Sequence, residues 1–158
     1  MLRKIIIIRH GEYTMGQCLT EKGKKQTNDL IPELVKSLMN EKKVLLLSSS
    51  APHAEESAKM LSDALNIPCE VHPEFWSNIS YKHKQDNPKA LALIKKRAKE
   101  KEANIVVLVT NLDYTIGLSN LIIGANEDSF VWRVLAEGEM LILNLKLEKE
   151  LTKGLILN

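Results

Sequence analysis

The sequence contains few cysteines and few aromatic residues. Cys18 and Cys69 are the two cysteines of the 158-residue chain, which excludes a disulfide framework and a zinc site built from several cysteines. Neither has an arginine six positions later, which excludes the cysteine-based phosphatase loop. Aromatic residues make up 4% of the chain, too few for a surface on which nucleic-acid bases stack.

The charge balance and the short apolar runs exclude further classes. A formal net charge of +2 gives no basis for a nucleic-acid or anionic membrane partner. The isoleucine run 5–8 meets Arg9 and His10 at once, so it is too short for the apolar part of a signal peptide. No run approaches the ~20 apolar residues of a membrane span. We therefore expect a soluble, cytoplasmic protein with no nucleic-acid or membrane partner.

Short apolar runs alternate with helical patterns along the chain. This alternation predicts one α/β domain over residues 1–158, with three layers: a mostly parallel central sheet and helices on both faces. The continuous apolar runs are typical of parallel strands that are buried on both sides. The predicted strands are 4–8, 44–47, 69–71 and 105–109, and the predicted helices are 20–39, a helix with Ala54, Ala58, Leu61 and Leu65 on one face, 87–102 and 112–123.

Capping and turn residues predict where the elements begin and end. Thr20 is a good N-cap, and Asn87-Pro88 predicts an N-cap followed by proline at the first helical position. Pro32 is expected to kink or restart the first helix. The runs 130–135 and 140–147 predict an antiparallel hairpin that closes the edge of the sheet.

Polar residues follow three of the predicted strands. The first strand leads into Arg9-His10-Gly11, the second into a serine run and His53, and the fourth into Thr110-Asn111. In an open α/β sheet, ligands bind outside the carboxyl ends of the parallel strands. We therefore expect these three segments to meet at one edge of the sheet.

The Arg9-His10-Gly11 segment has the residue types that phosphoryl chemistry needs. An imidazole can attack phosphorus in line while a guanidinium holds the equatorial oxygens, and the glycine lets the backbone turn. The alternative is that His10 is a polar residue at a strand end and that Arg9 forms a surface ion pair. Three residues alone do not decide between these interpretations.

Four segments in the same order resemble the histidine phosphatase superfamily, the phosphoglycerate mutase-like proteins. That family shows "RHGE", "LTxxGxxQ", "SSPLxRAxxTA" and "vlVTH", and the resemblance covers most of the chain. The short length resembles the compact phosphohistidine-phosphatase branch. The matching segments are IRHGE at 8–12, LTEKGKKQ at 19–26, SSSAPHAEESA at 48–58 and VLVTN at 107–111.

The resemblance implies a phosphate site that is only partly kept. It implies that His10 is the phosphorylated nucleophile and that Arg9 is a phosphate clamp. The family has a second arginine where this chain has His53, and a second histidine where it has Asn111. These two positions have alternatives, because Asn111 is also a good helix N-cap and His53 could lie on the surface.

The general acid of the family falls on a loosely matching segment. The resemblance places Ser77 where the family has its acidic residue, and Glu74 could stand in for it. Loss of one donor to a developing oxyanion costs ~10²–10³ in rate, and loss of a general acid costs ~10²–10⁴. Phosphate binding is therefore expected to survive these changes better than turnover does.

Two functions follow from this reasoning. The first is a weak or inactive phosphatase that binds an anionic ligand or a partner through Arg9, His10, His53 and Asn111. The second is an active phosphatase that works through a phospho-His10 intermediate. No cofactor and no metal ion are implied, and the expected partner is a phosphate-bearing small molecule or a phosphoprotein.

Overall fold

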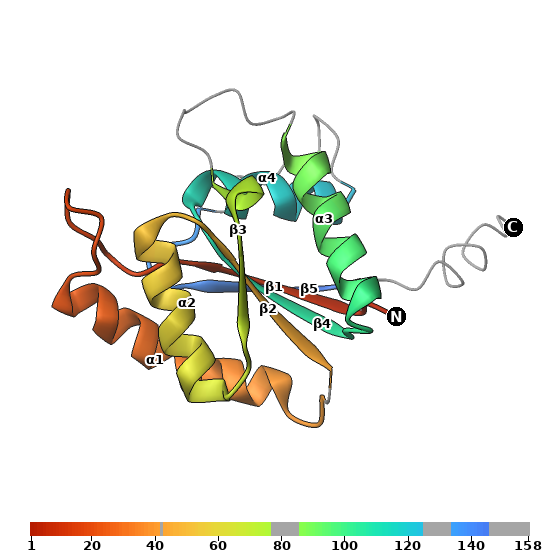
Figure 1. Cartoon of the computed structure of the whole chain (residues 1–158), viewed down its shortest axis with the longest axis horizontal. Coiled ribbons are helices and arrows are strands. Elements are labelled where there is room, and N and C mark those ends of the chain that lie inside the picture. Colours follow the sequence, from red (N-terminus) through yellow and green to blue (C-terminus); the bar gives the residue numbers. More distant parts are fainter. Residues whose placement is uncertain (42, 77–85, 125–133, 146–158) are drawn as a thin grey trace, which may run out of the picture.

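The computed structural model describes residues 1–41, 43–76, 86–124 and 134–145 (Figure 1). They form a five-stranded sheet in the order β3-β2-β4-β1-β5, in which β5 is antiparallel to β1 and the other neighbours are parallel. The predicted α/β architecture with an antiparallel edge is confirmed. The strands are β1 (Lys4–Arg9), β2 (Val44–Ser49), β3 (Cys69–His72), β4 (Ile105–Thr110) and β5 (Met140–Asn144), and the helices are α1 (Glu21–Leu38), α2 (Pro52–Leu65), the 3₁₀ turn η1 (Pro73–Phe75), α3 (Asp86–Glu100) and α4 (Leu112–Ile122).

The isoleucines of β1 are buried on both faces of the sheet. Ile6 and Ile8 pack in the cluster formed with α1 and α2, and Ile5 and Ile7 pack in the cluster formed with α3 and α4. Side chains alternate between the faces of a strand, so a strand covered on both sides is apolar at every position. Figure 1 shows α1 and α2 on one side of the sheet and α3 and α4 on the other, which confirms the three layers.

Helix α1 begins where the sequence predicts and runs past its proline. The Thr20 side chain accepts a hydrogen bond from Gly23 N at 3.0 Å, as an N-cap does. Pro32 lies inside the continuous helix, so the helix does not restart there, and a kink at Pro32 stays a prediction. Leu30 and Leu34 are buried on either side of Pro32. Their packing against the sheet stabilises the unbroken helix and offsets the backbone hydrogen bond that proline cannot donate.

Helix α3 begins earlier than the sequence predicts. It starts at Asp86, so Asn87 lies within the helix, and the predicted N-cap at Asn87 is wrong. Proline is tolerated throughout the first turn of a helix, where the N–H groups have no intrahelical acceptor, and Pro88 therefore does not fix the start. The Asn87 side chain packs against α4, where a Cβ on Gly117 would lie 2.1 Å from Asn87 Nδ2.

The predicted edge hairpin is described in part. Its second run forms β5, which pairs with β1 through partners such as Ile6 and Ile142. Val134 and Leu135, at the end of its first run, lie outside any strand, and residues 130–133 and 146–147 lie outside the described residues. Among the helices that the structure describes, none is long and apolar enough to cross a membrane.

Candidate active site

The structure brings the predicted strand-end residues together at one edge of the sheet. Arg9 pairs in register with Thr110 of β4, and His10 N donates to Thr110 O at 3.3 Å. Asn111 follows directly at the start of α4. The His53 ring, at the start of α2, lies 4.1 Å from the His10 ring between centroids. The predicted convergence of the three segments is therefore confirmed.

Two glycines let α1 pack directly against the backbone after His10. A Cβ on Gly11 would lie 2.3 Å from Gly23 O, and a Cβ on Gly23 would lie 2.0 Å from Glu12 O. Gly11 does not have a positive φ, so a left-handed turn is not the reason for glycine at this position. Both positions need glycine because the two backbones touch.

The segments that carry the family resemblance bond to one another. Glu12 N donates to Gln26 Oε1 at 2.8 Å, and Thr20 Oγ1 donates to Glu12 Oε1 at 2.9 Å. From α2, Ser57 Oγ accepts from Gly11 N at 3.2 Å. These side chains hold the segment after His10 in place, which is a structural role.

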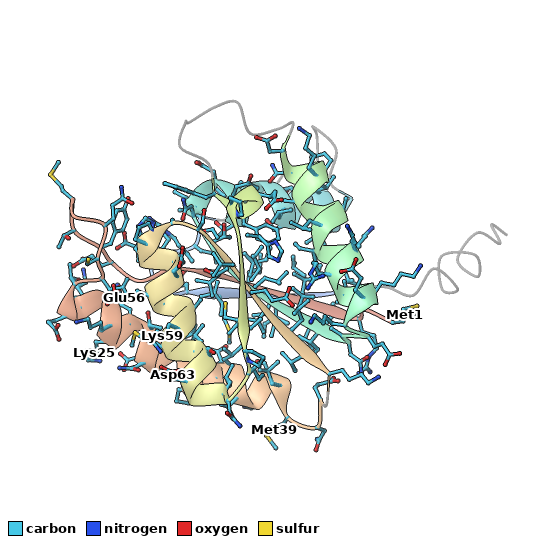
Figure 2. The ribbon with its side chains drawn as sticks, viewed as in Figure 1. Met1, Lys25, Met39, Glu56, Lys59 and Asp63 are labelled. Carbon is cyan, nitrogen blue, oxygen red and sulfur yellow. The ribbon has the colours of Figure 1, made fainter. Side chains whose placement is uncertain are left out.

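Helix α2 also holds the chain that leads into α1. Its Glu56, labelled in Figure 2, accepts a hydrogen bond from Leu19 N through Oε2 at 2.7 Å. Leu19 directly precedes the N-cap of α1 and is buried. The acidic residue in this part of the matching segment therefore has a structural role.

His10 is buried and has a defined orientation. Its Nδ1 lies 2.8 Å from Gly11 O, which can only accept, so Nδ1 carries the proton. The lone pair of the neutral ring is then on Nε2. Burial lowers the pKa of His10 to about 4, and the ring is neutral at pH 7. A neutral imidazole with its lone pair on Nε2 is the form required of a nucleophile.

Arg9 has one unpartnered donor. Its Nη1 donates to Leu135 O at 2.8 Å, and its Nη2 lies 3.5 Å from Glu137 Oε1. Its Nε is buried and has no hydrogen-bond partner among the described residues. The ion pair that was the alternative role for Arg9 is therefore present, with Glu137 as its partner. The Nε donor is still available to a ligand.

His53 and Asn111 also have buried polar atoms without partners. His53 is 5% exposed, so the alternative of a surface residue is wrong. Within the described part of the chain, both its ring nitrogens and Asn111 Oδ1 lack a hydrogen-bond partner. Burial lowers the pKa of His53, and the Asn111 side chain, which lies close enough to interact with the ring but outside hydrogen-bond geometry, opposes this by a smaller amount. Asn111 occupies the N-cap position of α4, but its side chain makes no capping hydrogen bond.

Tyr13 is a site residue that the sequence analysis missed. Its ring stacks on His53 with centroids 3.9 Å apart and meets the edge of His10 at 5.1 Å. Tyr13 is 42% exposed, whereas the two imidazoles that its ring contacts are 3% and 5% exposed, so the tyrosine covers part of them. The one sequence signal was its place three residues after His10, between the matching segments 8–12 and 19–26.

The candidates for the general acid lie apart from these contacts or outside the described residues. Glu74 lies in η1, and its Oε2 is 4.0 Å from His72 Nδ1. Ser77 lies outside the described residues. The described residues contain no group of three or more side chains that could hold a metal ion.

Comparison with known proteins shows the fold. No family model and no curated protein matches the sequence. Among solved structures, a mycobacterial glucosyl-3-phosphoglycerate phosphatase has a TM-score of 0.71 at 14% identity, with 90% of each chain covered. The alpha-ribazole phosphatase from Shigella flexneri has a TM-score of 0.67 at 15% identity, covering 90% of this chain and 91% of that chain.

A third solved structure is described as a phosphohistidine phosphatase. The candidate phosphohistidine phosphatase SixA from Agrobacterium tumefaciens has a TM-score of 0.66 at 19% identity, with 90% of each chain covered. The chain thus has the phosphoglycerate mutase-like fold of the histidine phosphatases. This confirms the fold that the sequence motifs implied.

Proposed function

We propose that this chain is a single-domain histidine phosphatase-family protein that binds a phosphoryl anion between Arg9, His10, His53 and Asn111. One observation carries the proposal: Arg9 Nε and both ring nitrogens of His53 are buried and have no hydrogen-bond partner in the described part of the chain. Buried polar groups are nearly always hydrogen-bonded, so unpartnered ones in one place indicate a missing ligand. A mycobacterial phosphatase of the same fold, 15% identical with a TM-score of 0.69, has been solved with inorganic phosphate.

The changed residues weaken catalysis more than binding. An arginine is charged at any physiological pH, whereas His53 carries charge only when it is protonated. Asn111 can donate a hydrogen bond from Nδ2 to a phosphoryl oxygen but supplies no charge. Because the developing charge of the transition state depends on such groups, we propose a weak or inactive phosphatase that holds a phosphate-bearing small molecule or a phosphoprotein in the cytoplasm.

The alternative function is an active phosphatase that forms phospho-His10. The bond from His10 Nδ1 to Gly11 O and the low pKa of the ring favour it, because both prepare Nε2 for attack. In this function Glu74 would have to protonate the leaving group, because the family's acid position holds Ser77, whose hydroxyl is too weak an acid.

A phosphatase assay over many phosphoesters separates the two functions, with His10→Ala as the control. Activity in the range of ordinary phosphatases that His10→Ala abolishes would establish the alternative. Binding is tested separately by calorimetry with phosphate. Affinity that falls in Arg9→Ala, with little or no turnover in wild type, is the result expected for the proposed function.

A further inference from the structure

The turn that precedes β5 is bonded to the backbone of Arg9 and His10. Arg9 N donates to Glu139 O at 3.0 Å, and Gly138 N lies 3.1 Å from both Arg9 O and His10 O. Glu137 sits in this turn. The position of its backbone relative to the proposed site is therefore fixed by three hydrogen bonds.

Gly138 packs the same turn against α1. Its φ is 74°, a conformation that glycine adopts without strain. A Cβ at this position would lie 2.5 Å from Gln26 Cβ. The turn is thus held on one side by the strand that carries Arg9 and on the other by the helix that packs against Gly11.

The contacts of Arg9 leave one edge of its guanidinium for an oxyanion. Leu135 O accepts from Nη1 and so fixes the plane of the group. The other edge consists of Nε and Nη2, whose N–H groups point in the same direction and can hold two oxygens of one anion. Nε has no partner among the described residues, but Nη2 lies 3.5 Å from Glu137 Oε1.

We propose that Glu137 is an internal competitor for this anion site. The proposal rests on the proposed function and adds a regulating residue to it. The carboxylate lies 3.5 Å from Nη2, one of the two nitrogens through which Arg9 would hold a phosphoryl group, and two anions at that nitrogen repel each other. A ligand therefore binds Arg9 only when the Glu137 side chain moves away.

The ion pair between Arg9 and Glu137 is weak enough for a bound anion to displace the carboxylate. The side chains of Arg9 and Glu137 are 19% and 26% exposed, and their separation is longer than that of a strong hydrogen bond. Partly exposed pairs of this kind are weak. The ion pair therefore lowers the affinity of the site for an anion but does not prevent binding.

Calorimetry with sulfate at pH 7 and constant ionic strength tests the proposal in wild type, Glu137→Gln and Glu137→Ala. The matched control is Glu102→Gln, which removes the same charge from an ion pair with Lys43, at the amino ends of the strands. We expect both Glu137 variants to bind sulfate about three- to tenfold more tightly than wild type, and the control to stay within about twofold.

Each result separates this proposal from the proposed function. If wild type binds sulfate and neither Glu137 variant binds it more tightly, Glu137 is not a competitor and the anion site stands. A loss of affinity in both variants also overturns the proposal, because Glu137 would then position Arg9. If no folded variant binds sulfate at all, the proposed function itself fails.

Discussion

Replacing His10 with asparagine is expected to change how stability depends on pH. Burial lowers the pKa of His10 from 6.5 to about 4. Between these pH values the unfolded chain binds a proton that the folded chain does not, so the free energy of unfolding falls as the pH falls below 6.5. At about 1.4 kcal/mol per pKa unit the whole difference is ~3 kcal/mol, of which about 2 kcal/mol is lost between pH 7 and pH 4.5.

Urea unfolding at pH 7 and pH 4.5 measures this loss in wild type and His10→Asn. The asparagine Nδ2 can still donate to Gly11 O, as His10 Nδ1 does. Carboxylates that titrate in this range do so in both proteins and cancel in the comparison. We expect the loss of stability between the two pH values to be about 2 kcal/mol smaller in the variant. Equal losses in the two proteins would refute the argument that His10 is held neutral by burial.

Three further predictions concern the proposed anion site. Arg9→Ala should lower the affinity for phosphate in calorimetry at least tenfold, since it removes the one permanent cation of the site, and unchanged affinity would place the anion elsewhere. His53→Arg combined with Asn111→His should raise hydrolysis of an aryl phosphate at least tenfold, and addition of His10→Ala should abolish the gain; high activity in wild type would contradict the reasoning. Because burial lowers the pKa of His53 and a bound anion raises it, sulfate affinity should strengthen as pH falls through the neutral range, and His53→Gln should lose part of that dependence; identical pH profiles would place His53 outside the site.

The arrangement of the sheet could be predicted because its signals are local. The apolar run of β1 and the cap at Thr20 each depend on a few neighbouring residues, and both appear in the structure as predicted. The tendency of Pro32 to end a helix and the tendency of Asn87 to cap one were both outweighed by packing. Leu34 is fully buried beyond Pro32, and the Asn87 side chain packs against Gly117 in a different helix. Contacts of this kind cannot be read from one segment.

The same distinction applies to the candidate site. Arg9, His10 and Asn111 could be placed together because parallel strands bring their carboxyl ends to one edge of a sheet. Glu137 could not, since it is far from Arg9 in the sequence and reaches it only through the pairing of β1 and β5. Tyr13 was missed because nothing in the sequence shows that its ring stacks on His53.

The residues that differ from the family pattern make the charge of the proposed site depend on protonation. With an arginine at position 53 the site would hold two permanent cations, whereas His53 is buried and its lowered pKa favours the neutral ring. His10 is also neutral at pH 7, and Arg9 lies beside the carboxylate of Glu137. The site without ligand therefore carries almost no net charge. In the proposed function, an anion that enters the site displaces Glu137 and favours the protonated form of His53. Binding is then coupled to proton uptake, which a site with two arginines does not need.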